Sequence, residues 1–251
     1  MTESQLWGIW ALRAGRSRMD RSVATYLDGM GDDLLIPHTM FLLRGPKNVI
    51  VDTSFQSVEA VKSAYPQEIW RDPDEEPAAL LAACNISPAD VELVICTHLH
   101  YDHCGSNRLF VSAEVVVQRR ELDYALHPRA AMMAREFFSP AAGFTPPYEV
   151  DQLRIIDGEA DLAPGLRVIP LPGHTPGLQG VVVTTARGRA GILGDHVMLR
   201  ANWDQTIPVG LHTSVDDWYT STDRVRPLVD YVLPSHDMEL FGTASLIARV
   251  A

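Results

Sequence analysis

The chain is expected to be an α/β protein with its sheets inside and its helices outside. Three observations indicate this fold class. Apolar, strand-like runs come first, and runs of the same kind then alternate with helical stretches, in two broadly similar halves. No internal repeat and no low-complexity linker interrupts them. Because 251 residues are long for one domain and short for two, we expect residues 1–251 to form a single domain.

The first part of the chain is predicted to consist mainly of strands. Residues 6–12 are rich in apolar side chains, and residues 22–27 partly alternate between apolar and polar ones. Two further runs, residues 39–44 and 48–53, flank a Gly-Pro turn. A strand, a turn and a second strand in this order predict a β-hairpin.

Helical patterns follow the hairpin. Residues 57–65 predict a short helix capped by Ser57. After a charged stretch with two prolines, a second helix is expected over residues 78–84. Residues 91–96 are apolar, β-branched and about one strand long, and such a run predicts a buried strand.

The remainder of the chain alternates between the two kinds of element. Strands are predicted over residues 114–118, 154–156, 166–169, 180–185, 190–194 and 231–233. Helices are expected over residues 119–126, 130–138, 216–228 and 238–250. Residues 139–148 are rich in Pro, Ala and Gly, and this composition is typical of an irregular, mobile loop near a site.

Three imidazoles and a carboxylate occupy the six residues that follow the buried strand. His98, His100 and Asp102 alternate along the chain, so an extended or tightly turned backbone can point them the same way. A bend at His103 would aim its ring at the same place. Imidazole together with carboxylate suits Zn, Fe, Mn or Co better than Ca or Mg. A chance run of histidines on a solvated loop is the alternative, but the end of a buried strand is where α/β proteins usually build sites.

Three further polar residues stand at strand-to-loop junctions downstream. His174 lies in Pro-Gly-His-Thr-Pro-Gly, Asp195 follows the strand predicted over residues 190–194, and His236 follows the one over residues 231–233. Each alone has a simpler explanation, such as a polar cap or a helix N-cap. Together with the histidine cluster they indicate four strand ends that present metal-ligating side chains.

The composition of the chain restricts the classes of molecule that it can bind. The net charge of -11 disfavours nucleic acid and anionic membrane surfaces, which need a basic face. The first residues carry no basic and apolar leader, and no apolar run approaches the length of a membrane span. The three cysteines form no CxxC pair, which is typical of a reduced, cytoplasmic protein. We expect a small-molecule substrate, and the oligomeric state is open.

The segment His-Leu-His-Tyr-Asp-His at residues 98–103 resembles the HxHxDH signature of the metallo-β-lactamase superfamily. His174, Asp195 and His236 match the later ligands of that superfamily in kind and order. Within it, the chain is most similar to the N-acyl-homoserine lactonase group. This resemblance implies a four-layer αβ/βα sandwich that holds metal ions at the edge of its two sheets.

The resemblance also implies roles for these residues. It places His98, His100 and His174 on one metal ion, and Asp102, His103 and His236 on a second. Asp195 would bridge two zinc ions, with iron, manganese or cobalt as alternatives. A metal-bridging hydroxide would attack the carbonyl of a small lactone, and Asp102 would carry a proton to the leaving oxygen.

The substrate contacts follow the family pattern less closely. Lactonases of this group carry a tyrosine three residues after the bridging aspartate, and this chain has Met198 there. Methionine cannot donate the hydrogen bond of that tyrosine. His212 is therefore a candidate substrate contact and proton donor, and an ordinary surface histidine before the predicted helix is the alternative. Tyr101 is expected to form a wall of the cleft or to pack in the core.

The other histidines carry weaker indications. His196 is expected to support the site or the fold, and neither His38 nor His127 indicates a function. Phe137, Phe138 and Phe144 line the cleft or belong to the core.

Three functions are compatible with the sequence. The first is a lactonase that acts on an N-acyl-homoserine lactone or another ring such as 4-pyridoxolactone. The second is a hydrolase of the same fold that cleaves a small amide, ester or isothiocyanate. The third is an iron oxidoreductase of this fold, which a complete second metal site and the length of the chain disfavour.

Overall fold

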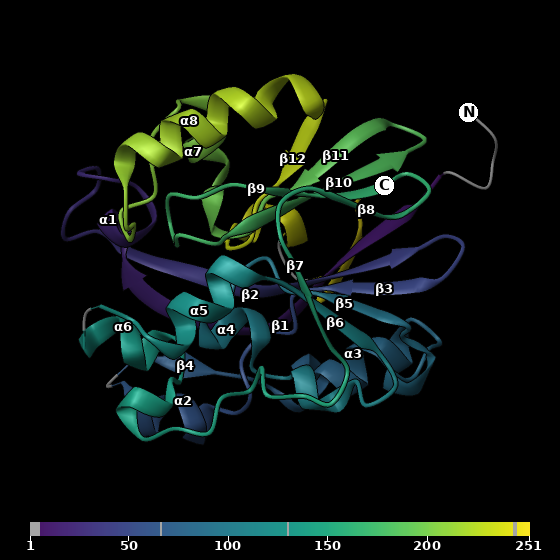
Figure 1. Cartoon of the computed structure of the whole chain (residues 1–251), viewed down its shortest axis with the longest axis horizontal. Helices are drawn as coiled ribbons and strands as arrows, with labels where there is room; N and C mark the ends of the chain where they lie inside the picture. The colour runs from purple at the N-terminus through teal and green to yellow at the C-terminus, as the bar shows by residue number, and fades with distance from the viewer. Residues whose placement is uncertain (1–5, 66, 130, 243–244) are drawn as a thin grey trace.

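The computed structural model describes residues 6–65, 67–129, 131–242 and 245–251. Two β-sheets face each other at its centre, and helices cover the outer face of each (Figure 1). Helices α7 (Arg200–Asp204) and α8 (Val215–Val225) lie over the smaller sheet, and the helices between residues 58 and 136 lie over the larger one. The described residues therefore form the four layers that the sequence predicts.

The larger sheet begins with two long antiparallel strands and continues with shorter parallel ones. Its order is β13-β1-β2-β3-β5-β6-β7, and β4 pairs with β1. The strands are β1 (Gly8–Asp20), β2 (Asp33–Arg44), β3 (Asn48–Val51), β4 (Ile69–Trp70), β5 (Leu93–Ile95), β6 (Glu114–Gln118), β7 (Leu153–Ile156) and β13 (Ile247–Arg249). The predicted hairpin is the β2–β3 pair.

The smaller sheet has the order β12-β11-β10-β9-β8. Its strands are β8 (Ala160–Ala163), β9 (Leu166–Pro170), β10 (Gln179–Thr185), β11 (Gly188–Ile192) and β12 (Tyr231–Leu233). Strands β11 and β12 are parallel, so their carboxyl ends, which carry Asp195 and His236, meet at the same edge. The sequence did not indicate β8, which is a short strand at the edge of this sheet.

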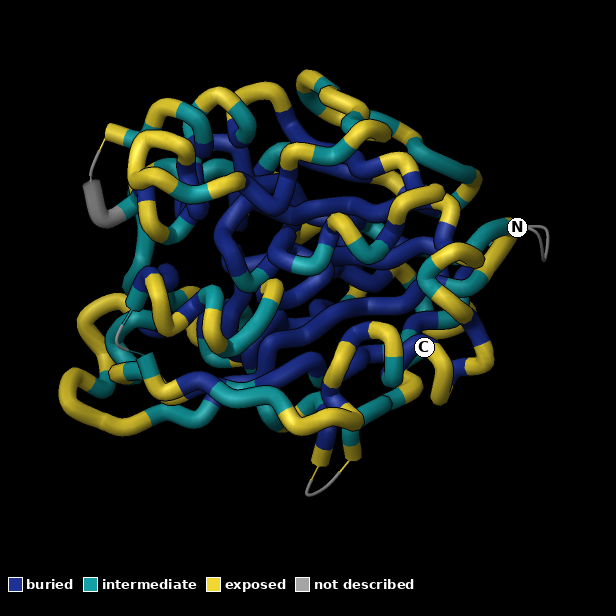
Figure 2. Tube along the Cα trace, turned by 90° about the horizontal axis from the view of Figure 1, so that it is seen from below, coloured by how far each residue is buried: buried dark blue, intermediate teal, exposed yellow. Residues whose placement is uncertain are grey.

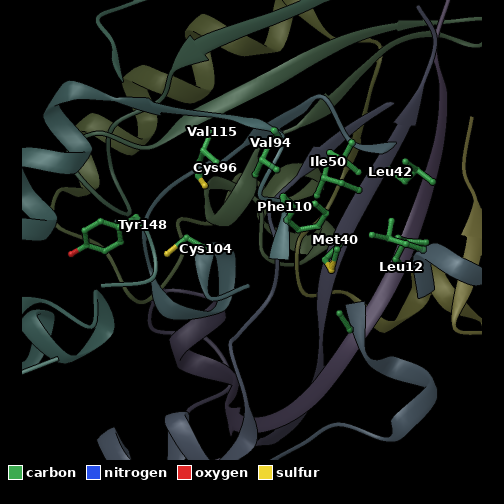
Figure 3. Close-up of a cluster of buried hydrophobic side chains, with 14 of the residues drawn as sticks. Leu12, Met40, Leu42, Ile50, Val94, Cys96, Cys104, Phe110, Val115 and Tyr148 are labelled. Atoms are coloured by element: carbon green, nitrogen blue, oxygen red, sulfur yellow. The ribbon is translucent and has the colours of Figure 1, made fainter. Parts of the chain in front are cut away.

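Neighbouring residues of the central strands contribute to two different cores because successive side chains point to opposite faces. Leu43 of β2 and Val51 of β3 pack between the sheets, against Val181 of the smaller sheet. Leu42 and Ile50 point the other way, into the layer between the larger sheet and its helices (Figure 3). The buried parts of the chain accordingly run along the central strands (Figure 2).

Several helices lie within one residue of their predicted bounds. The remaining helices are α1 (Arg21–Ala24), α2 (Val58–Ala64), α3 (Pro77–Ala83), α4 (Tyr101–Cys104), α5 (Arg119–Leu126) and α6 (Ala131–Glu136). Ser57 caps α2 by accepting a hydrogen bond from the backbone N–H of Ala60. Of the helices in the described ranges, none combines the length and apolarity needed to cross a bilayer.

Two predicted elements are wrong. Residues 22–27 are helix α1 and a turn rather than a strand, because the Asp20 carboxylate accepts hydrogen bonds from the Ser22 backbone N–H and hydroxyl and starts a helical turn. The closing helix expected over residues 238–250 is a short 3-10 turn, Met238–Phe241, followed by β13. There the free edge of β1 provides backbone partners that a helix could not use.

Candidate metal centre

The seven side chains expected to bind metal converge at one edge of the two sheets. Three groups of imidazole and carboxylate atoms lie close enough together to hold an ion: His98–His100–His174, His38–Asp102–His236 and His98–His103–Asp195. Below, the first subsite denotes His98, His100 and His174, and the second subsite denotes Asp102, His103 and His236. Except for the partly buried Asp102, these ligand candidates and Asp195 are buried.

The first subsite consists of three imidazoles with their ring nitrogens turned toward one another. Nδ1 of His100 lies 3.0 Å from Nε2 of His98 and 3.0 Å from Nε2 of His174. The two Nε2 atoms are 3.2 Å apart. Burial lowers the pKa of all three rings, so they are neutral and each can offer a lone pair.

The second subsite joins two imidazoles to a carboxylate. Nε2 of His103 lies 3.2 Å from Nε2 of His236. Oδ2 of Asp102 lies 3.8 Å from the first of these nitrogens and 3.7 Å from the second. This subsite therefore includes an anionic ligand, and the first subsite does not.

Asp195 lies between the two subsites with one carboxylate oxygen toward each. Its Oδ1 is 3.2 Å from Nε2 of His103 and 3.1 Å from Nε2 of His236. Its Oδ2 is 3.5 Å from Nε2 of His174 and 4.0 Å from Nε2 of His98. Burial alone would raise the pKa of Asp195, but His236 and His103 lower it well below its usual range, so the carboxylate is ionised.

Hydrogen bonds on the outer side of each ring decide which nitrogen faces the centre. Nδ1 of His174 donates to the carbonyl of Leu211, and Nδ1 of His236 donates to the carbonyl of Pro37 at 2.8 Å. A carbonyl only accepts, so each Nδ1 carries a proton, and Nε2 is the nitrogen that faces the centre and offers a lone pair when the ring is neutral. Lone pairs aimed at a shared point repel one another unless a cation lies between them.

Asp52 orients two more of the rings. Its carboxylate accepts from Nδ1 of His103 at 2.8 Å and from the Thr97 hydroxyl at 2.8 Å. That hydroxyl lies 3.2 Å from Nδ1 of His98 and, having given its proton to Asp52, can accept from this nitrogen. Both rings again turn Nε2 inward. Nε2 of His100 has no hydrogen-bond partner within the described ranges. This donor set fits a pair of divalent cations of the zinc type.

Glu121 ties together the two loops that carry the first subsite. Its buried carboxyl accepts from the backbone N–H of Leu99, the Thr175 hydroxyl and the backbone N–H of Gly177. Burial raises the pKa of Glu121 to about 7. A Cβ on Gly177 would lie 2.1 Å from the Glu121 nitrogen, so only glycine permits this approach. The sequence indicated neither Asp52 nor Glu121 as a part of the site.

A cavity of about 870 Å³ opens onto both subsites. His100, Asp102, Asp195 and His236 line its inner end, and Tyr101 and Met198 also belong to its wall. The Tyr101 hydroxyl donates to Oε1 of Gln67 at 2.7 Å, and its ring stacks on Phe138. Tyr101 meets both expectations, because it belongs to the cavity wall and also packs in a buried apolar cluster.

The cavity does not include every residue expected there. His212 instead lines a second cavity, and its Nδ1 donates to the Val209 carbonyl at 2.8 Å while its ring packs edge-on against Tyr26. These contacts hold the His212 ring outside the first cavity. The three phenylalanines are likewise not among the lining residues, and Phe137 and Phe138 are buried in the core.

The structure adds residues that the sequence did not indicate. Glu136 and Tyr65 line the first cavity. Burial, and then the charge of Asp102, raises the pKa of Glu136 to about 7. Nδ1 of His38 lies 3.2 Å from Oδ2 of Asp102. The signal for His38 in the sequence is its place inside the apolar run of β2, where a polar side chain is unusual.

His196 has the supporting position expected of it. Its ring stacks on Trp218, and its Nε2 lies 3.0 Å from the Thr222 hydroxyl. The Trp218 indole N–H donates to the His196 carbonyl. The residue thus fixes the segment next to Asp195 against helix α8.

Known proteins share this sequence pattern and fold. The family model described as the metallo-beta-lactamase superfamily matches residues 33–236. A curated N-acyl homoserine lactonase of a Bacillus species is 26% identical over 213 residues, which cover 80% of each protein. The N-acyl homoserine lactonase AttM of Azorhizobium caulinodans is 28% identical over 229 residues, which cover 83% of this chain and 85% of the relative.

Solved structures show the same architecture. An N-acyl homoserine lactone hydrolase with N-hexanoyl-L-homoserine bound at its catalytic metal center has a TM-score of 0.79 at 24% identity, and 95% of each chain is covered. AidC, a dizinc quorum-quenching lactonase, has a TM-score of 0.66 at 15% identity, and the match covers 94% of this chain and 89% of AidC. Because the family match spans most of the chain and the fold agrees, this protein belongs to the metallo-beta-lactamase superfamily and is a metal-dependent hydrolase.

Proposed function

We propose that the protein is a dinuclear metal-dependent lactonase that opens small, uncharged lactone rings. The observation that carries this proposal is the position of Asp195, which turns one oxygen toward each of two neighbouring groups of imidazoles. The curated relatives named N-acyl homoserine lactonase support the choice of a cyclic ester as the substrate.

Seven side chains would hold the two ions, which we propose to be zinc. The first subsite would bind one ion and the second subsite the other, with Asp195 shared between them. When bound, such a pair supplies Lewis acidity and a water molecule with a pKa near 7. Iron, manganese and cobalt accept the same ligands, so metal analysis of protein purified without chelator is the measurement that decides the element.

Asp102 is suited to move a proton during ring opening. Its side chain is 13% exposed, against 5% for Asp195, and it lines the cavity. Burial alone would raise the pKa of Asp102, but His103 and His38 lower it below its usual range, so the group is an ionised acceptor at neutral pH. From this position it can accept a proton and return it to the leaving alkoxide oxygen of the opened ring.

The charge of the cavity favours a neutral substrate. Its outer wall includes the carboxylates of Asp20, Asp32, Asp33 and Glu68, and Arg18 is the cation among its lining residues. Arg18 forms ion pairs with Asp33 and Glu68, which leaves the wall acidic. A substrate that carries a carboxylate would be repelled, whereas an N-acyl-homoserine lactone and other neutral lactones would not. Met198 offers apolar contact in place of a hydroxyl.

The test is a lactone panel followed with a pH indicator. The panel contains N-acyl-homoserine lactones, 4-pyridoxolactone and an acyl-homoserine lactone with a terminal carboxylate on its acyl chain. We expect hydrolysis of a neutral lactone, and a kcat/KM about 5-fold lower for the carboxylate analogue at low salt, a difference that salt reduces.

Two variants control the panel. His103→Ala, in the second subsite, should abolish turnover, and His127→Ala, on an exposed histidine outside the cavity, should leave it unchanged. Hydrolysis of linear esters, amides or isothiocyanates without any lactone would refute the lactonase proposal. A coloured, iron-containing protein without hydrolase activity would support the oxidoreductase alternative.

A further inference from the structure

We propose that His38 is a positioning residue of the metal centre, and that its Nδ1–H holds the Asp102 carboxylate in the second subsite. This role rests on the proposed pair of metal ions but not on the identity of the substrate. His38 lies on β2, 64 positions before Asp102.

The His38 ring is buried and aimed at the centre. It is 1% exposed, and its Nδ1 lies 3.2 Å from Oδ2 of Asp102. Within the described ranges this nitrogen has no hydrogen bond that satisfies it. An unsatisfied buried N–H is costly, and the Asp102 carboxylate is the acceptor within reach.

The Asp102 carboxylate determines the tautomer, and the other side of the ring is compatible with it. Nε2 of His38 lies 3.1 Å from the hydroxyl of Ser17, which is itself fully buried on the neighbouring strand β1. A carboxylate can only accept, so the ring must present Nδ1–H to Asp102. The serine hydroxyl then donates to Nε2. Ser17, His38 and Asp102 thus form a chain of donors that ends at the carboxylate.

Packing fixes the plane of the His38 ring. It lies edge-on to Phe55, with ring centroids 5.0 Å apart, and edge-on to His236 of the second subsite, at 5.5 Å. The ring therefore has little freedom to turn away from Asp102.

Asp102 needs such a partner more than the other ligand candidates do. His174, His236 and His103 each donate from Nδ1 to a carbonyl or carboxylate behind the ring. The imidazoles around Oδ2 of Asp102 are His38 at 3.2 Å, His236 at 3.7 Å and His103 at 3.8 Å. His38, Asp102 and His236 also lie close enough together to hold an ion. His103 and His236 complete the second subsite with Asp102, however, and we assign to His38, which belongs to neither subsite, the role of orienting the carboxylate from outside.

Metal binding tests this role without reference to turnover. Metal-free protein is titrated with zinc in the presence of a chelating dye, which gives the affinity of each of the two binding steps. His38→Leu removes the donor, and we expect it to weaken one step about 10–100-fold and to leave the other unchanged. His38→Asn keeps an N–H close to the position of Nδ1, and we expect it to restore the affinity to within about 3-fold of the parent.

Controls separate the donor from packing. Phe55→Leu removes a ring that packs on His38 but leaves the donor, so it should weaken the same step much less than His38→Leu does. Ser17→Ala should weaken the same step as His38→Leu, to a smaller extent. In cobalt-loaded protein, the visible absorption bands should change for His38→Leu and persist for His38→Asn.

Two results would overturn the role of His38. They are two zinc ions bound by His38→Leu as tightly as by the parent, and a loss in His38→Asn as large as in His38→Leu. If the parent chain itself binds a single zinc ion, the dinuclear proposal fails as well. The comparison with the parent therefore distinguishes failure of the positioning role from failure of the proposed function.

Discussion

The two subsites differ in what sets the charge and the orientation of their ligand side chains. The first subsite is made of neutral imidazoles, two of which stand two residues apart in one short segment, and burial lowers their pKa. The second subsite contains the partly exposed Asp102 and faces the cavity. It depends on groups far away in the sequence, namely the Pro37 carbonyl, His38 and Asp52.

This difference suggests a division of work between the subsites. The first subsite is buried and braced by Glu121, which suits the retention of an ion. The second subsite combines an anionic ligand with access to substrate, which suits proton transfer and ring opening. Substitutions that affect only one subsite should therefore differ in their effects on metal binding, turnover and stability.

The largest effect is expected at Asp195, because both subsites share this residue. Its carboxylate faces both subsites, so Asp195→Ala should lower kcat/KM on the order of 1,000-fold or more and reduce the metal content of the chain. Steady-state kinetics and elemental analysis of the same sample measure this. A variant that keeps two ions and most of its activity would remove the basis for a shared ligand.

Glu121 braces the first subsite from behind, and its loss should act on folding. Glu121→Ala leaves three buried donors without their acceptor, which should lower the free energy of unfolding by roughly 3 kcal/mol. Urea denaturation of the metal-free protein measures the change. Asp123→Ala, an exposed position on the same helix, is the matched control and should have little effect.

Asp52 contacts His103 of the second subsite directly and reaches His98 of the first only through Thr97, so its loss should act on metal binding, chiefly at the second subsite. Asp52→Asn keeps the size of the side chain but weakens the acceptor for Nδ1 of His103. We expect zinc affinity to fall about 10–100-fold at one binding step, as measured by chelator competition. Equal weakening of both steps would show that Asp52, which also contacts Thr97 beside His98, supports the two subsites alike.

Glu136, which lines the first cavity, makes the stability of the folded chain depend on pH. Burial, and then the charge of Asp102, raises its pKa from 4.5 to about 7 in the folded chain. Between these values the unfolded chain is ionised and the folded chain holds the proton, so this group's contribution to stability is complete below about pH 4.5 and is lost as pH rises to about 7.

The matching variant is Glu136→Gln, which cannot titrate. Relative to the parent, the metal-free variant should gain about 3 kcal/mol of stability between pH 4.5 and 7 and gain little more above that range. Denaturation at a series of pH values measures this difference. If the difference in the free energy of unfolding between the parent and the variant is the same at every pH, Glu136 does not carry the proton that the structure assigns to it.

Much of the architecture could be predicted from local patterns. The strand at residues 114–118 and the helix at residues 119–126 have their predicted bounds. The periodicity of apolar side chains and the capping of helices depend on residues that are near one another in the chain, so the sequence reveals them. One of the two wrong elements lies where local preference gives way to tertiary pairing. Residues 247–249 form a strand because β1 offers them a free edge, which no pattern within the segment reveals.

The sequence by itself determined which residue types stand at the strand ends, since metal chemistry restricts them to histidine and aspartate and the chain presents them in a recognisable order. Tertiary structure alone decided which other groups face them. Asp52, Glu121, Glu136 and His38 gain their positions from residues that are remote in the chain, and His212 is held outside the first cavity by its contacts with Val209 and Tyr26. The physical reason is that hydrogen bonding and burial, which set the tautomer and charge of a side chain, depend on neighbours that the fold brings together.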